Sequence, residues 1–404
     1  MIQIFAGMLG GIVFGIISGL TPGIHVNMVA AFLLGLSPLL LPVLGSEGLA
    51  AMVISIIITH SFLDIIPATF LGVPEEGTCI SVLPAHSLAQ NGRGEEAVRI
   101  SALGSLWGVV FAIPLAFAAL QFIPILQPVI DVFTGVLLVL IMGIIIVKSE
   151  APGWCMALFL VSGVLGCFAF SFSYLSWNSA GAGEILMPLL TGLFGLPFLL
   201  ISSKGKIPRQ RPFKVSMENN ALIRSAVPAS LAGLIVGWLP GLSTASANAL
   251  ISGYIPYDKD RMGYLVASGA TATANALIGI AVFISIGRMR NGAMIVFSAL
   301  ETPSLFFLIT IAAIVSLLAF LITIYLAGLA NFLSSLSGNN LNTIVILFLI
   351  IICGIFTGPF GMLILILSTM LGIVPGLVEV SRIPCIGVVT IPVILYSFGF
   401  GGFS

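Results

Sequence analysis

Hydrophobic residues in this chain form long, nearly continuous runs instead of the short alternations of a soluble protein. Runs of about 20 apolar residues, the length that crosses the hydrocarbon core of a bilayer, recur between Ile4 and Phe400. Polar residues gather between the runs, most densely from Ser203 to Asn220. This pattern predicts an all-α polytopic membrane protein with about 10–12 transmembrane helices.

Two of the apolar runs are interrupted by the same motif. Pro22-Gly23 and Pro240-Gly241 each end a G-x-x-x-G-x-x-P-G sequence, and the two copies are offset by 218 residues. Proline removes a backbone donor and glycine permits unusual backbone angles, so each copy predicts two half-helices that meet at an unwound point. Irregular backbone in a membrane is tolerated where it is buried or lines a cavity, and paired broken helices indicate a transporter binding site.

The repeated motif divides the chain into a first transmembrane half (1–202), a basic linker (203–220) and a second half (221–404). The linker carries five Lys or Arg residues before its first acidic residue, Glu218, which predicts a cytoplasmic location. We expect the halves to be pseudo-symmetric, with their Pro-Gly breaks facing each other near the bilayer midplane. Hydropathy leaves open whether the repeat is parallel or inverted.

One further stretch, Pro67–Asn91, contains three prolines and two glycines and is not a clean span. We interpret it as a re-entrant or broken hairpin. The following sequence GRGEEAV (Gly92–Val98) predicts a helix start, with glutamates in the first turn where the helix dipole favours them.

Composition agrees with the membrane assignment. The 404 residues are 59% hydrophobic and 7% charged, with mean hydropathy +1.23 and zero net charge. These values argue against a soluble enzyme and against nucleic acid as a partner. The five cysteines are scattered, so neither a metal site nor a disulfide framework is expected. The first apolar run lacks a basic leader and a cleavage site, and we expect it to be retained.

Polar side chains follow each Pro-Gly break. Free N–H groups and the positive dipole end of a half-helix favour anions, so two such ends predict a binding site. The alternative is that small and hydroxyl residues only let helices pack closely. The candidate substrate-binding residues are Thr21, Pro22, Gly23, Ile24, His25, Asn27, Pro240, Gly241, Leu242, Ser243, Thr244, Asn248 and Asn275.

Ionisable residues within the predicted spans suggest ion coupling. Thr59, His60 and Asp64 lie on one span, and His60 and Asp64 share a helix face because they are four residues apart. A structural pair near a helix end is the alternative interpretation. Arg288 and Arg290 would either attract an anion or mark a cytoplasmic helix end.

The early Pro-Gly motif, followed by the stretch Leu71–Gly108, resembles the large membrane subunit of the tripartite tricarboxylate transporters, the TctA family. Leu71–Pro74 occupies the position of the family's L-N-I-P, and Gly92–Ala97 that of its helix start. The chain departs from the family at Gly72, where the family has Asn, and is shorter than usual. The resemblance implies import of a small carboxylate, an extracytoplasmic binding protein and a small membrane subunit.

Three function classes follow. The first is a secondary active transporter in the cell membrane, moving a di- or tricarboxylate with a proton or sodium gradient and no cofactor. The second is a flippase for a phosphorylated polyprenyl lipid, whose phosphate also suits a half-helix end. The third, an intramembrane enzyme using His60, Asp64 or His86, is not expected, because the chain has no H-E-x-x-H or G-x-S-x-G motif.

Overall fold

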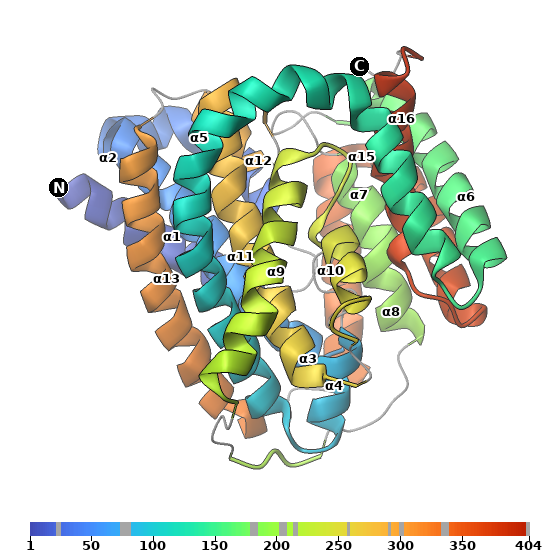
Figure 1. Ribbon diagram of the computed structural model, residues 1–404, viewed down its shortest axis with the longest axis horizontal. Coiled ribbons are helices and arrows are strands. Elements are labelled where there is room, and N and C mark those ends of the chain that lie inside the picture. Colours follow the sequence, from blue (N-terminus) through green and yellow to red (C-terminus); the bar gives the residue numbers. More distant parts are fainter. Residues whose placement is uncertain are drawn as a thin grey trace.

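The computed structural model describes residues 1–21, 26–72, 82–177, 185–201, 208–212, 217–256, 259–289, 292–298, 303–332 and 339–400 (Figure 1). Every regular element in these ranges is a helix, and eight helices are long and apolar enough to cross a membrane. The predicted class, an all-α multi-pass membrane protein, is confirmed. The elements are α1 (Ile2–Leu20), α2 (Val26–Leu63), α3 (Ile65–Phe70), α4 (Val82–Gln90), α5 (Gly94–Val147), α6 (Pro152–Ser171), η1 (Ser173–Leu175), α7 (Leu186–Leu190), η2 (Thr191–Gly195), α8 (Leu196–Ile201), α9 (Asn219–Trp238), α10 (Thr244–Ser252), α11 (Arg261–Ile286), α12 (Gly292–Ser298), α13 (Leu305–Gly328), α15 (Asn339–Leu377), η3 (Ile383–Ile386) and α16 (Gly387–Ser397).

Three helices, α2, α5 and α15, are longer than one membrane crossing, and each contains glycines or prolines at which it can bend. Gly45 and Gly358 have φ values of 66° and 64° and divide α2 and α15 into two arms each. The 54-residue α5 contains Pro114, Pro124 and Pro128 and stays helical past all three. Figure 1 shows α5 rising beside α11, crossing the top of the molecule and descending toward α6. Internal prolines kink helices, which accounts for this path.

Glycines allow α1 to lie directly against the second arm of α2. A side chain at Gly15 would overlap Thr59, and one at Gly19 would overlap Leu63. The contacts advance in the same direction along both helices, so α1 and this arm are parallel. Small residues permit such close approach between membrane helices.

The second copy of the motif makes the same contacts on α11. A side chain at Gly233 would overlap Ala274, and one at Gly237 would meet Ile278. The two contacted residues lie 215 positions after their counterparts in α2, for both glycines. The repeated motif therefore corresponds to a repeated helix packing.

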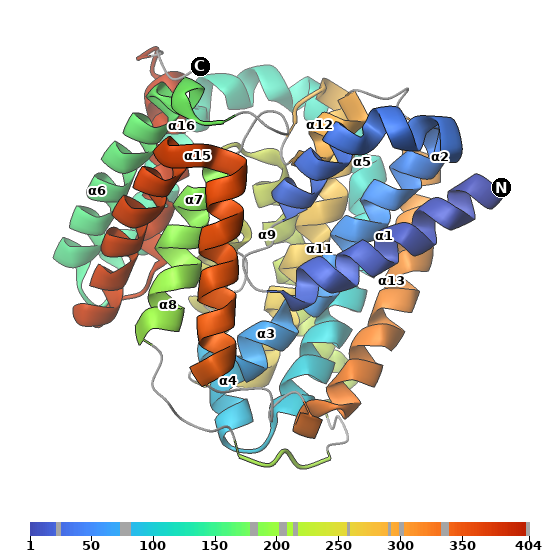
Figure 2. The same cartoon turned by 180° about the vertical axis from the view of Figure 1, so that it is seen from behind.

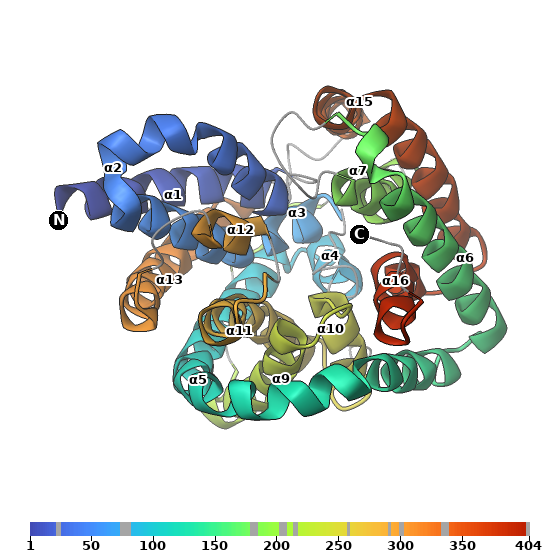
Figure 3. The same ribbon diagram turned by 90° about the horizontal axis from the view of Figure 1, so that it is seen from above.

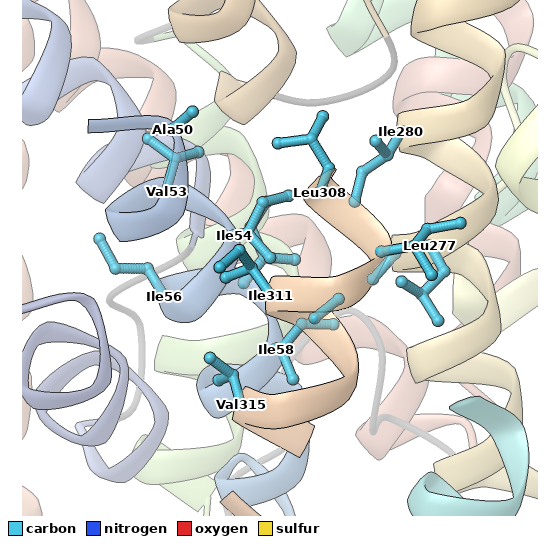
Figure 4. Packing of buried hydrophobic residues seen from close by; sticks show 14 of the residues in the cluster. Ala50, Val53, Ile54, Ile56, Ile58, Leu277, Ile280, Leu308, Ile311 and Val315 are labelled. Atoms are coloured by element: carbon cyan, nitrogen blue, oxygen red, sulfur yellow. The ribbon is translucent and has the colours of Figure 1, made fainter. Parts of the chain in front are cut away.

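Each of these helix pairs is completed by a third parallel helix. Gly104 and Gly108 of α5 approach Val266 and Ala270 of α11. In the other group, α13 packs its apolar face on the second arm of α2 (Figure 4). The Thr323 hydroxyl, far along α13, lies 3.5 Å from the carbonyl oxygen at the end of that arm.

The two groups of three run in opposite directions. The second arm of α2 descends toward α3 and α4, whereas α5 and α11 begin at that level and rise (Figures 1 and 2). Arg261, the first residue of α11, donates to Ser87 of α4 at 3.1 Å, which places the start of α11 there.

A third group of helices contains α6, α7, α8, α15 and α16. Seen from above, α6, α7, α15 and α16 gather on the side of the molecule away from α1, α2 and α13, and α5 connects the two sides (Figure 3). Within this group α16 packs on α6, and α15 packs on α7, η2 and α8. The described residues thus form two groups of three parallel helices and a further group that combines α6, α7 and α8 with α15 and α16.

Candidate functional site: the second Pro-Gly break

The predicted break in the second half is present. Helix α9 ends at Trp238, Leu239 is extended, and α10 begins at Thr244. Gly241 has a φ of 75°, in the left-handed region that favours glycine. The sequence prediction of two half-helices joined by unwound backbone is therefore confirmed at Pro240-Gly241.

Helix α16 fixes the backbone of this break. The fully buried Thr390 hydroxyl donates to the Gly241 carbonyl oxygen at 2.7 Å. Leu138 of α5 and Val393 of α16 lie closest to the position that a Gly241 side chain would occupy. Sequence reasoning missed Thr390, because a lone threonine 149 residues from its partner carries no local signal.

The start of α10 carries hydrogen-bond donors that find no acceptor in the described part of the chain. Ser243 is the N-cap residue, yet its side chain makes no capping bond. Among the described residues, the buried Oγ atoms of Ser243 and Ser246 have no hydrogen-bond partner. The first N–H groups of any helix also lack intrahelical acceptors. A buried unpaired hydroxyl costs about 1–3 kcal/mol, which a bound acceptor would remove.

The other predicted residues of the second half join α10 to α11. Asn248 Nδ2 donates to the Ser268 hydroxyl at 3.2 Å, and the Tyr264 hydroxyl donates to the Asn248 carbonyl at 3.3 Å. Asn275 is half-buried on the α11 face that meets Gly237. Asn248 lies on α10, the helix that begins just after the break. Asn275 lies on α11 and contacts α9, the helix that ends just before the break.

Most of the predicted first site lies outside the described residues. This applies to Pro22, Gly23, Ile24 and His25, and to the side chain of Asn27. Thr21 ends α1 in an extended conformation, and its N–H donates to the Ile17 carbonyl at 3.1 Å. The first break, and its placement opposite the second, stay predictions.

The three predicted coupling residues lie beside the end of α1. His60 Nδ1 is 3.1 Å from the Ser18 hydroxyl oxygen, a partner that sequence reasoning missed. The Thr59 hydroxyl is fully buried and has no hydrogen-bond partner among the described residues. Asp64 is half-buried between α2 and α3, and its N–H donates to the His60 carbonyl at 3.0 Å.

The helix start predicted at GRGEEAV is confirmed, since α5 begins at Gly94 with two glutamates in its first turn. Arg93 pairs with Glu96 at 2.6 Å, and Arg99 pairs with Glu95 at 2.8 Å. The hydrogen bond to Glu96 raises the pKa of Arg93 above its ordinary value.

Linker residue Gln210 secures this helix start. Its Oε1 accepts from the Gly94 N–H at 2.8 Å, and its Nε2 donates to the Ala89 carbonyl at 3.0 Å. Its own N–H donates to Asn331, beyond α13, at 2.7 Å. The linker thereby connects the first half of the chain to the second.

Two other polar residues have structural partners. His86 Nδ1 lies 2.9 Å from the Thr69 carbonyl oxygen and joins α4 to α3. Arg288 pairs with Asp131 of α5 at 2.6 Å. Linker residue Gln210 lies at the start of α5, whereas Arg288 follows the end of α11, which rises away from that level (Figure 1). The positive-inside rule therefore cannot place both basic segments in the cytoplasm. Among the described residues, no group of three His, Cys, Asp or Glu side chains could hold a metal ion.

Comparison with known proteins identifies the family. Residues 5–387 match the model of the tripartite tricarboxylate transporter TctA family. The chain is also 32% identical over 287 residues to the uncharacterized protein MJ1079 of Methanocaldococcus jannaschii, an alignment that covers 70% of this chain and 69% of the relative. No solved structure matches the chain. The family model covers nearly the whole chain, and the described residues within it form helices long and apolar enough to cross a membrane, so this chain belongs to the tripartite tricarboxylate transporter TctA family.

Proposed function

We propose that the protein is the permease of a tripartite system and imports a small di- or tricarboxylate, which binds at the start of α10. The observation that carries this proposal is the pair of buried hydroxyls of Ser243 and Ser246 at the start of α10, which have no hydrogen-bond partner within the described part of the chain. A carboxylate oxygen accepts from hydroxyl and N–H donors and gains from the helix dipole. No full positive charge is then needed at the site.

The proposed transport mechanism uses the opposed helix groups. The three helices within each group are parallel, and the two groups run in opposite directions with equivalent glycine contacts. This arrangement supports an inverted repeat. In such transporters a substrate site at the repeat interface opens alternately to each side. We assign the linker face to the cytoplasm on the basis of its uncompensated bases.

Coupling to a sodium or proton gradient is proposed for Thr59, His60 and Asp64. The buried Thr59 hydroxyl oxygen can ligate a sodium ion, and Asp64 can carry a proton or a cation. The membership of a tripartite family supports delivery of substrate by an extracytoplasmic binding protein, together with a small membrane subunit.

A thermal-shift panel on the purified permease tests the substrate class. It compares di- and tricarboxylates with polyprenyl phosphates, each with and without sodium. A ligand of the folded state at 100 times its Kd adds about 2.7 kcal/mol to the free energy of unfolding. We expect carboxylates to raise the Tm. Stabilisation by polyprenyl phosphates alone would favour a lipid flippase instead.

A further inference from the structure

Three polar contacts in series join α5 to the ends of α9 and α11. Trp238 Nε1 donates to Gln127 Oε1 at 2.7 Å, and Gln127 Nε2 donates to Asp131 Oδ1 at 2.7 Å. The same Oδ1 atom pairs with Arg288 Nη2 at 2.6 Å. We call Gln127, Asp131, Trp238 and Arg288 the polar latch.

The polar latch lies beside the second break, on the face opposite the linker. Trp238 is the last residue of α9 and precedes Pro240 by two positions. Helix α9 starts next to the linker and is 20 residues long, so its ends are about 30 Å apart. Arg288 follows Gly287, which ends α11 with a φ of 69°. Gln127 lies in α5 between Pro124 and Pro128, two of the three prolines in that helix.

Gln127 gives the polar latch its geometry. Its side chain uses the carbonyl end for Trp238 and the amide end for Asp131, and the residue is only 8% exposed. The Arg288 and Asp131 side chains are 37% and 43% exposed, and an exposed ion pair alone contributes little stability. Gln127, however, connects this ion pair to the indole N–H of Trp238.

We propose that Gln127, Asp131 and Arg288 are positioning residues that hold the Pro240-Gly241 break closed on this face, and that separation of Asp131 from Arg288 opens it. The role in transport rests on the proposed function, because the break must then be reached from each side in turn. The mechanical part concerns the ligand-free protein and does not depend on the substrate.

Maleimide labelling of a cysteine in the break tests this inference. Leu242 is 8% exposed, so Leu242→Cys should react slowly in the otherwise native protein. Arg288→Gln should speed labelling by at least about fivefold, the effect of losing roughly one hydrogen bond. Trp238→Phe, which keeps an aromatic ring but loses the indole N–H, should have the same effect. Arg288→Lys, which keeps the charge, should stay near the parent rate.

The matched control is Glu95→Gln, which removes an ion pair at the other end of α5 and should leave the labelling rate unchanged. Unchanged labelling in both Arg288→Gln and Trp238→Phe overturns the proposal. So does equally fast labelling of the native cysteines in Arg288→Gln, because the whole protein would then have loosened. The labelling experiment needs no substrate. A failure of the proposed function would therefore appear separately, in the thermal-shift panel with carboxylates.

Discussion

Replacement of Ser243 and Ser246 by alanine should weaken carboxylate binding at least tenfold. A hydrogen bond to a charged ligand contributes about 1.5–3 kcal/mol, and a tenfold change in Kd corresponds to about 1.4 kcal/mol. The ligand-free double variant should be as stable as the parent or slightly more stable, because both removed hydroxyls are buried without partners among the described residues. Ligand titration monitored by Tm measures both effects.

Ser252→Ala is the matched control for this experiment. Ser252 lies at the other end of α10, and its hydroxyl donates to the Ala249 carbonyl at 2.6 Å. It should leave carboxylate affinity unchanged. If the double variant binds as tightly as the parent, the free start of α10 is a packing feature and not the anion site.

Replacement of Gly104 by valine should strongly destabilise the protein. A Cβ atom at this position would lie 2.6 Å from the Cα atom of Val266, so α5 and α11 would have to separate. Overpacking of this kind costs about 1–3 kcal/mol and at times more. We expect a lower Tm and a lower yield of monodisperse protein.

Gly143→Val provides the control on the same helix, because a side chain there meets nothing within 4 Å. Both variants carry the same helix-propensity change, so the difference between their Tm values isolates the packing term. Equal Tm values in the two variants would show that the close contact between α5 and α11 is not important for stability.

Local chemistry made part of this structure predictable. Pro240-Gly241 forces a break because the missing donor and the left-handed glycine act within a few residues. The glutamates after Gly94 mark a helix start, because acidic side chains in the first turn interact favourably with the helix dipole. Long apolar runs predicted a membrane protein, although they could not show that α5 continues as one helix through three prolines.

Contacts between distant residues could not be predicted. Thr390 reaches Gly241, and Gln210 reaches Gly94, across more than a hundred residues. The sequence indicated that Arg288 could mark a helix end. Its pairing with Asp131 could not be predicted, because it depends on the path that α5 takes through the molecule. That the Ser246 hydroxyl is buried without a partner among the described residues could be seen only in the structure, because in the sequence Ser246 is one of several small polar residues after the break.

The most direct test of the account is uptake of a labelled di- or tricarboxylate into proteoliposomes. They would contain the purified permease with its binding protein and small subunit, under an imposed sodium or proton gradient. The account predicts uptake against the substrate gradient, which is lost with Ser243→Ala and Ser246→Ala and kept with Ser252→Ala. Absence of carboxylate uptake under either gradient, with movement of a labelled polyprenyl phosphate across the same membranes, would contradict it.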